Sequence, residues 1–307
     1  MEPTQVALAQ PRSLSVTKVT GMVFADRTDL AAEASEPTEP TEPTEGASAA
    51  MATDAQLAHD LARAAGQLLL QVRAKNAGID PAQLKDLGDR SAQELLAAGL
   101  ARARPLDSVL SEEAADDRTR LDADRVWIID PLDGTREYSE GRHDWAVHVA
   151  LWERGTLTAG AVALPGLQLV LTTDPPAEVP AAPAASASAG NAAVPALRMA
   201  VSRTRPPAVA DRLTERLGLQ TVPMGSAGYK VAAVVRGEVD VYVHAGGQYE
   251  WDSAAPVAVA LAAGLHASRI DGSPLLYNQP DVLLPDLVVC RPELADLVLA
   301  TIAEVST

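Results

Sequence analysis

Hydrophobic residues recur at helical spacing near the start of the patterned part of the chain. Leu57, Leu61, Leu68 and Val72 follow the cap candidate Thr53 and would share one face of a helix. This spacing predicts an amphipathic helix from about Thr53 onward. A second helix is expected over residues 91–100.

The middle of the chain shows the shorter pattern of strands. An apolar run over residues 126–129 leads directly into Asp130. Apolar or alternating runs follow at 144–152, 156–164 and 167–173, separated by Gly155 and by Pro165-Gly166. Turn residues between such runs predict an antiparallel meander.

The last third alternates between strand and helix patterns. Strands are expected at 197–202, 239–244 and 286–290, and helices at 206–217, 226–236, 252–263 and 292–305. Such alternation is typical of an α/β unit. The predicted fold class is therefore α/β, with an α+β half followed by an α/β half.

Two segments lack any such pattern. From Glu36 the sequence Glu-Pro-Thr occurs three times in succession, and residues 174–196 are rich in Pro, Ala and Ser. We therefore expect a disordered tail over 1–52, an N-terminal half over 53–173, an insertion over 174–196 and a C-terminal half over 197–307. Met51 is a hypothetical alternative start.

Composition narrows the possible functions. The formal net charge of −16 argues against binding to nucleic acid or to an anionic membrane, which requires clustered Lys and Arg. Cys290 is the single cysteine, so an intrachain disulfide is excluded. Neither a signal peptide nor a run of about 18 apolar residues is present, so we expect a cytoplasmic protein.

Acidic residues stand at the ends of several predicted elements. Asp130 and Asp133 follow the apolar strand, Glu112 follows a short apolar run, and Asp252 opens a predicted helix. Converging carboxylates repel each other unless they are protonated or bridged by cations, and hard divalent ions suit oxygen ligands. The alternative is that the aspartates only cap helices, one of which begins near Gly134.

These acids lie in sequences that resemble a known family. Glu112-Glu113, Asp130-Pro131-Leu132-Asp133-Gly134-Thr135 and Trp251-Asp252-Ser253-Ala254-Ala255 are similar, in order and spacing, to motifs of the lithium-sensitive, magnesium-dependent phosphatases of the inositol monophosphatase superfamily. The resemblance covers about residues 54–305. It implies a layered αβαβα sandwich with metals in the cleft between the two halves.

The resemblance also implies ligands for about two or three Mg²⁺ ions. These are the side chains of Glu112, Asp130, Asp133 and Asp252, and the Leu132 carbonyl. Asp89 matches more loosely and would help to bind a third ion and pair with Thr135. For Asp89, capping of the helix at 91–100 is the alternative.

The implied chemistry is hydrolysis without a covalent intermediate. Water held near Glu112 and Thr135 would attack phosphorus, and the ion fixed by Asp252 would stabilise the leaving alkoxide. The phosphate would rest on the backbone N–H groups of Gly134 and Thr135 at a helix start.

Within the superfamily, three stretches look most like the CysQ-type 3'-phosphoadenosine 5'-phosphate phosphatases: Ser111-Glu112-Glu113, Arg136-Glu137-Tyr138 and Asp144-Trp145-Ala146-Val147. The substrate-binding candidates that follow are Gly134, Thr135, Arg136, Gly225, Ser226 and Lys230, with Arg203 as a further candidate for a second phosphate. The alternatives are a plain loop glycine at 225, a helix cap at Ser226 and surface charges at the Lys and Arg positions. His143 and His148 are interpreted as structural or surface residues.

The sequence therefore predicts a phosphomonoesterase that acts on a small phosphate ester, removing the 3'-phosphate of 3'-phosphoadenosine 5'-phosphate. Activity on inositol phosphates or fructose-1,6-bisphosphate is an enzymatic alternative. A metal-binding regulatory protein without turnover is an alternative of another class. The family resemblance makes a homodimer plausible.

Overall fold

The computed structural model describes residues 52–181 and 196–306. The predicted tail over 1–52 therefore lies almost wholly outside the described residues, as does most of the predicted insertion over 174–196. The division of the chain into two halves at these boundaries stays a prediction.

Two long helices open the described chain. Helix α1 (Asp54–Lys75) starts where the sequence indicates, and the Thr53 side chain accepts a hydrogen bond from the Gln56 N–H over 3.2 Å. Helix α2 (Pro81–Ala103) is capped by Asp80 and begins earlier than the predicted 91–100. The expected start at Ser91 was wrong because Asp80-Pro81 supplies the start signal and Gly88 weakens the hydrophobic pattern of the first turns.

A five-stranded sheet with the order β1-β2-β3-β4-β5 follows. Its strands are β1 (Ser108–Ser111), β2 (Arg125–Asp133), β3 (Ala146–Glu153), β4 (Thr156–Leu164) and β5 (Leu169–Thr172). Strands β2 to β5 pair in antiparallel fashion, which confirms the predicted meander, and β1 lies parallel to β2. Short helices connect these strands: η1 (Arg118–Asp122), α3 (Thr135–Ser139) and η2 (Pro165–Leu167).

The second sheet is mixed and has the order β7-β6-β8-β10-β9. Its elements are β6 (Arg198–Ser202), α4 (Ala208–Leu217), β7 (Gln220–Met224), α5 (Ala227–Val235), β8 (Val241–Tyr249), α6 (Glu250–Ala262), β9 (His266–Ser268), β10 (Leu283–Cys290), η3 (Pro292–Leu294) and α7 (Ala295–Ser306). The sequence did not predict β7 and β9. Both are edge strands, and β7 carries a proline and is largely exposed, so neither has a clear hydrophobic pattern.

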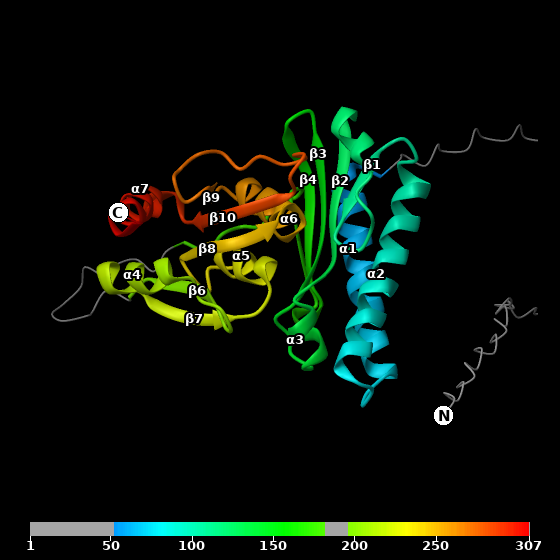
Figure 1. The fold of residues 1–307 in the computed structure, drawn as a ribbon, viewed down its shortest axis with the longest axis horizontal. Coiled ribbons are helices and arrows are strands. Elements are labelled where there is room, and N and C mark those ends of the chain that lie inside the picture. The colour runs from blue at the N-terminus through cyan, green and yellow to red at the C-terminus, as the bar shows by residue number, and fades with distance from the viewer. Residues whose placement is uncertain (1–51, 182–195, 307) are drawn as a thin grey trace, which may run out of the picture. The chain divides into compact units, whose positions relative to one another are not determined.

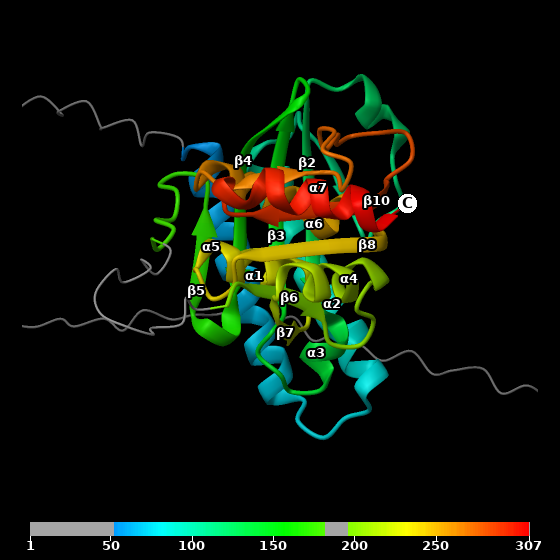
Figure 2. The same cartoon turned by 90° about the vertical axis from the view of Figure 1, so that its left-hand side faces the viewer.

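The elements stack in five layers (Figures 1 and 2). Helices α1 and α2 cover the outer face of the first sheet, α5 and α6 lie between the sheets, and α4 and α7 cover the second sheet. This arrangement confirms the predicted αβαβα sandwich. It also explains the apolar run in β2, where Val126 and Ile128 pack between the sheets while Trp127 packs under α1 and α2.

Helix α6 is the central element, because it contacts strands of both sheets. Residues Ser253–Ala260 are all buried, and most of them are small. A Cβ atom at Gly160 of β4 would lie 2.9 Å from the Ala258 Cβ, so the helix approaches the first sheet closely. The many alanines of this chain therefore serve close packing between layers.

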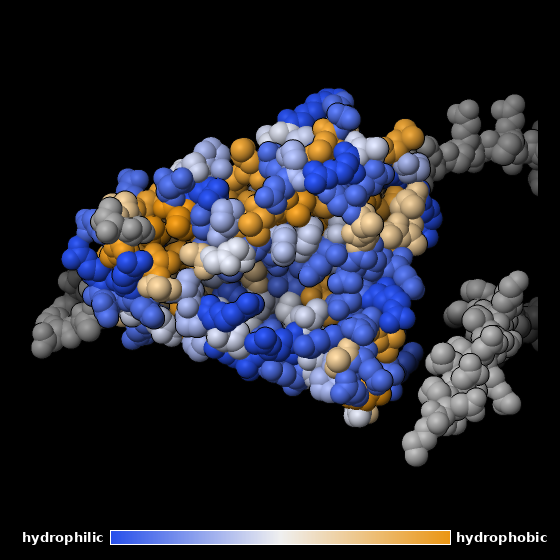
Figure 3. Space-filling view, in the orientation of Figure 1, coloured by the Kyte–Doolittle hydropathy of each residue, from blue (hydrophilic) through white to orange (hydrophobic). Residues whose placement is uncertain are grey.

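The surface is mainly hydrophilic in the view of Figure 3, with hydrophobic residues gathered across the C-terminal half. Among the described residues, no helix is long and apolar enough to span a membrane.

Tyr138 anchors the short helix α3 to α1. Its hydroxyl donates a hydrogen bond to the Leu69 carbonyl over 2.9 Å, and its ring meets the Trp145 ring edge to face at 5.1 Å. The Tyr138 side chain is fully buried. Residues 134–139 are thereby fixed against the first layer.

We expect Tyr138→Phe to lower the free energy of unfolding by about 1 kcal/mol, since it removes one buried hydrogen bond and keeps the ring. Urea denaturation measures this change. Tyr229→Phe is the matched control, because no hydrogen bond to the Tyr229 hydroxyl is present within 52–181 and 196–306. Equal stability of both variants would contradict the anchoring role.

Candidate functional site

Three aspartates converge where the first sheet meets α6. Carboxylate oxygens of Asp130, Asp133 and Asp252 lie within 4.8 Å of one another. Residues three apart in a regular strand point to opposite faces, but β2 carries a bulge against β3 between Asp130 and Asp133. The bulge lets both side chains face the same point.

Asp130 is the deepest of the three. It is 1% exposed, and its Oδ1 accepts a hydrogen bond from the Leu132 N–H over 2.9 Å. Its Oδ2 has no hydrogen-bond partner within the described residues. Burial and the negative charges of Glu112, Asp133 and Asp252 raise the pKa of Asp130 well above its usual value. His148 Nδ1 lies 3.9 Å from Asp130 Oδ2. A buried carboxylate oxygen that lacks a hydrogen bond and lies beside two other acids fits a bound cation.

Asp133 is held from the opposite side of the cleft. It accepts hydrogen bonds from the Ser226 hydroxyl and the Gly228 N–H, each over 2.6 Å, and from the Ala227 N–H over 3.2 Å. Burial alone would raise the pKa of Asp133, but His148 and these donors lower it to about 2. Asp133 is therefore a fixed anion that joins β2 to the start of α5.

The helix-cap alternative for the aspartates needs correction. Asp133 does bind N–H groups at a helix start, but at α5 rather than at the helix beginning near Gly134. Asp252 is the third residue of α6, not its N-cap residue, which is Tyr249, but its side chain does cap the helix start as part of a capping box. Its carboxylate accepts a hydrogen bond from the Tyr249 N–H over 2.6 Å.

His148 lies beside the cluster. Its Nε2 is 3.3 Å from Asp133 Oδ2, and its Nδ1 is 3.0 Å from the Trp251 carbonyl oxygen. Burial would lower the pKa of His148, but Asp133 outweighs that effect and raises it. His148, interpreted from the sequence as a structural or surface residue, is buried next to the site and pairs with Asp130 in the β2–β3 register. His143 is exposed, as expected.

Glu112 reaches the site because β1 runs parallel to β2, so the two strands end at the same edge. The Glu112 side chain stands at the rim of the cleft and keeps access to solvent. Burial of its carboxylate and the charges of Asp252, Glu113, Asp133 and Asp89 raise its pKa to about 7.

Asp89 lies inside α2, so the interpretation as a helix cap was wrong. The adjacent Gly88 lets the helix approach, since a Cβ there would lie 3.0 Å from both Leu132 Cδ2 and Tyr138 Cε1. Burial and the charges of Glu113 and Asp86 raise the pKa of Asp89 to about 7. No hydrogen bond joins Asp89 to Thr135 in the described part of the chain, so that pairing stays a prediction.

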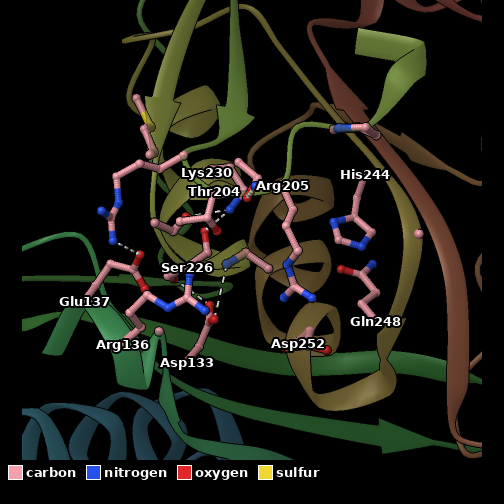
Figure 4. Close-up of a pocket in the computed structure, with 18 of the residues that line it drawn as sticks. Asp133, Arg136, Glu137, Thr204, Arg205, Ser226, Lys230, His244, Gln248 and Asp252 are labelled. Carbon is pink, nitrogen blue, oxygen red and sulfur yellow. Dashed lines mark hydrogen bonds and ion pairs between the residues drawn. The ribbon is translucent and has the colours of Figure 1, made fainter. Parts of the chain in front are cut away.

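A cleft of about 700 Å³ opens beside the cluster and draws residues from both sheets (Figure 4). The lining residues on the side of the first sheet include Glu112, Asp133, Gly134, Thr135 and Arg136. The opposite side includes Arg205, Gly225, Ser226, Lys230, His244, Gln248 and Asp252. All the predicted substrate-binding residues therefore line one cleft.

Gly134 must be glycine for steric reasons. Its φ is 91°, and a Cβ there would lie 3.0 Å from the Ser226 Cβ and 3.2 Å from the Trp145 Cβ. Helix α3 begins directly afterwards at Thr135, as the sequence predicted. Binding of a phosphate at this helix start stays a prediction.

The alternatives of a surface charge at Lys230 and a plain loop glycine at Gly225 were wrong. Lys230 is 5% exposed rather than a solvated charge, and its Nζ donates to the Gly225 and Ser226 carbonyls over 2.5 and 2.6 Å. Burial lowers its pKa to about 8. Gly225 is no ordinary loop glycine, because a Cβ there would lie 2.3 Å from Glu137 Cγ. Ser226 does cap α5, accepting from the Tyr229 N–H over 2.9 Å.

The arginines of the cleft fall into two groups. Arg203 pairs with Glu137 over 2.9 Å and with Glu140 over 2.7 Å, so its charge is compensated within the protein. Arg136 and Arg205 are exposed, and within the described ranges neither side chain forms an ion pair. The sequence analysis did not single out Arg205, because an arginine before Pro206-Pro207 resembles any surface loop residue.

Comparison with known proteins identifies relatives of this chain. Residues 51–307 match the sequence profile described as the inositol monophosphatase family. A protein of Mycobacterium leprae named 3'-phosphoadenosine 5'-phosphate phosphatase is 54% identical over 82% of this chain and 94% of its own length. A protein of the same name from Mycobacterium bovis is 56% identical over 78% of this chain and 90% of its own. The solved structure of CysQ from Bacteroides thetaiotaomicron superposes with a TM-score of 0.63 at 25% identity, covering 78% of this chain and 97% of that one.

The raised acid pKa values predict an unusual pH dependence of stability. Glu112 and Asp89 titrate at about 7 and Asp252 at about 6 when folded, against ordinary values near 4, so the folded state binds more protons between those limits. In a chelator, stability should therefore fall as the pH rises from about 4 to about 7. The raised pKa of His148 continues the fall at higher pH, because its contribution to stability is complete below about pH 6.5 and is lost as the pH rises through its folded-state pKa.

Thermal denaturation in a chelator across this pH range is the measurement. Glu112→Gln should flatten the profile, while Glu215→Gln on the exposed surface of α4 is the control and should leave it unchanged. Adding a divalent cation should restore stability at the higher pH. A profile that rises with pH in the chelator would contradict the convergence of these acids.

Proposed function

Because the chain belongs to the inositol monophosphatase family, we propose that it removes the 3'-phosphate of 3'-phosphoadenosine 5'-phosphate, releasing AMP and inorganic phosphate. The observation that carries this proposal is the identity of 54–56% to relatives of that name over 90–94% of their length. The matched region includes all the carboxylates and the whole cleft.

We propose Mg²⁺ as the cofactor, with about two or three ions bound. Asp130, Asp133 and Asp252 would hold them together with Glu112, the Leu132 carbonyl and Asp89. The buried Asp130 Oδ2, which has no hydrogen-bond partner among the described residues, supports this assignment. When bound, Mg²⁺ polarises phosphate oxygens, favours deprotonation of water and neutralises the leaving oxygen.

The residues of this chain would then divide the remaining tasks. Glu112 stands at the rim, where its carboxylate can accept a proton from water, and the Thr135 hydroxyl can orient that water. The N–H groups of Gly134 and Thr135 would bind the phosphate at the start of α3. Lys230, buried and bonded to two carbonyls, would add positive charge beside Ser226 without moving.

The substrate is thus a small phosphate ester that enters an open cleft, and the proposed location is the cytoplasm. Cys290 is buried in β10, where burial raises the pKa of its thiol to about 12, which supports a structural thiol rather than a reactive one. A homodimer is plausible from the resemblance alone, and light scattering would determine the oligomeric state.

Phosphate release tests the proposal. We expect a strong preference for 3'-phosphoadenosine 5'-phosphate over inositol 1-phosphate and fructose-1,6-bisphosphate, full dependence on magnesium, and inhibition by lithium. Preference for either sugar-type ester would keep the mechanism and overturn the substrate assignment. No release from any ester would support a metal-binding protein without turnover.

Asp130→Asn tests the cation site directly. We expect kcat to fall at least about a hundredfold, because the buried ligand for the ion loses its charge. In a chelator the variant should melt at a higher temperature than the unmodified protein, since the substitution relieves repulsion within the acid cluster.

Calorimetry with and without magnesium separates the two effects. Magnesium should raise the melting temperature of the unmodified protein and of Asp122→Asn, an exposed control on η1, but raise that of Asp130→Asn far less. Activity near the original level in Asp130→Asn would show that the site is assigned wrongly.

A further inference from the structure

Gln248 has a buried and unsatisfied side chain. It lies near the end of β8, is 5% exposed, and lines the cleft. Neither its Oε1 nor its Nε2 has a hydrogen-bond partner within the described residues. Burying an unpaired carboxamide destabilises a protein, so the folded chain carries this cost without any gain from its own contacts.

The neighbours of Gln248 are already committed elsewhere. His244 Nδ1 lies 3.1 Å from the Tyr242 hydroxyl, and His244 Nε2 lies 3.2 Å from the Gly247 carbonyl oxygen. Both ring nitrogens thus have partners, and the contact of Nε2 with Gly247 holds the bulge that β8 forms against β10 just before Gln248. The histidine positions the glutamine and leaves its carboxamide open to the cleft.

Arg205 lies on the same side of the cleft. In Figure 4, the side chains of Arg205, His244 and Gln248 lie to the right of those of Arg136, Ser226 and Asp133, with Asp252 below Arg205. Arg205, His244 and Gln248 all line the cleft. Burial and the positive charges of Lys230 and Arg205 lower the pKa of His244. Arg203, in contrast, is bound by two glutamates. Arg205 is exposed and forms no ion pair among the described residues, so its guanidinium is available to an anionic ligand.

We propose that Gln248 is a specificity-determining residue that binds the nucleoside part of the substrate, and that Arg205 beside it binds the second phosphate. This inference rests on the proposed function and names the residues that would distinguish a nucleoside bisphosphate from a simple phosphate ester.

The chemistry of the two side chains favours this occupant. A carboxamide offers a donor and an acceptor in one plane, which complements a nucleobase edge or a ribose hydroxyl. A guanidinium binds phosphate through paired N–H groups. A cleft of about 700 Å³ has room for a nucleotide beyond the scissile phosphate and the ions that would hold it.

Three substrates separate the two roles: 3'-phosphoadenosine 5'-phosphate, adenosine 3'-phosphate and inositol 1-phosphate. Gln248→Leu should lower kcat/KM about tenfold for both nucleotides and leave inositol 1-phosphate within about twofold. Arg205→Ala should lower kcat/KM about tenfold to a hundredfold for the bisphosphate alone. Gln220→Leu and Arg212→Ala, both at exposed positions, are the matched controls.

A stability measurement distinguishes binding from a structural role. Gln248→Leu removes an amide that has no partner, so its melting temperature should equal or exceed that of the unmodified protein. A clear fall in melting temperature, with equal losses for all three substrates, would overturn the proposal. Unchanged kinetics for the nucleotides in Gln248→Leu would overturn it as well.

Two analogues then locate the contact. If Gln248 binds the base, the unmodified protein should discriminate against a bisphosphate whose purine lacks the amino group, and Gln248→Leu should not. If Gln248 binds the ribose, the unmodified protein should discriminate against the 2'-deoxy bisphosphate, and Gln248→Leu should not. Discrimination that persists in Gln248→Leu for both analogues would overturn the nucleoside contact. An unmodified protein that releases phosphate from inositol 1-phosphate but from neither nucleotide would overturn the proposed function itself.

Discussion

The mutual repulsion of buried carboxylates is the constraint on which this structure depends. Oxygens of Asp130, Asp133 and Asp252 lie within 4.8 Å of one another, and Asp130 is almost completely shielded from water. Such a cluster opposes folding unless protons or cations compensate it. Strong packing elsewhere must hold it together. That packing comes from β2, apolar on both faces, and from α6, whose small buried residues fit between two sheets.

The two sheets are joined at the cluster by polar contacts. Asp133, at the end of β2, binds Ser226 and the first N–H groups of α5, and it is flanked by His148 of β3. Gly228 is required here, because a Cβ at that position would lie 1.9 Å from His148 Nε2. One aspartate thus serves as a candidate ion ligand and as the link between layers. A change at Ser226 or Gly228 would therefore alter both stability and the site.

Local signals predicted the order of helices and strands, whereas the layered fold and the meeting of the acids were predicted from the resemblance to the family. The apolar run before Asp130, the meander and the alternation after residue 197 follow from hydrophobic periodicity, and the acids lie in recognisable motifs. Helix α2 was placed too late because Gly88, needed for close packing against Leu132 and Tyr138, interrupts the pattern. His148 and Arg205 were missed because their importance depends on the pairing of β2 with β3 and on the shape of the cleft, which appear only in three dimensions.

Most of the buried side chains with an unsatisfied polar atom in the described chain lie at or beside the acid cluster and the cleft. Within the described residues, the buried polar atoms without a hydrogen-bond partner include Asp130 Oδ2 and both polar atoms of Gln248, whose side chains belong to elements that form the site. Atoms of His148, Arg203, Arg236 and Trp251 also lack one within these residues. A chain selected for stability alone would replace these groups or pair them, as it pairs Lys230 with two carbonyls. We therefore infer that side chains with satisfied polar groups, such as Lys230, shape the cleft. Side chains with unsatisfied groups, such as Asp130 and Gln248, are available to bind ions and substrate.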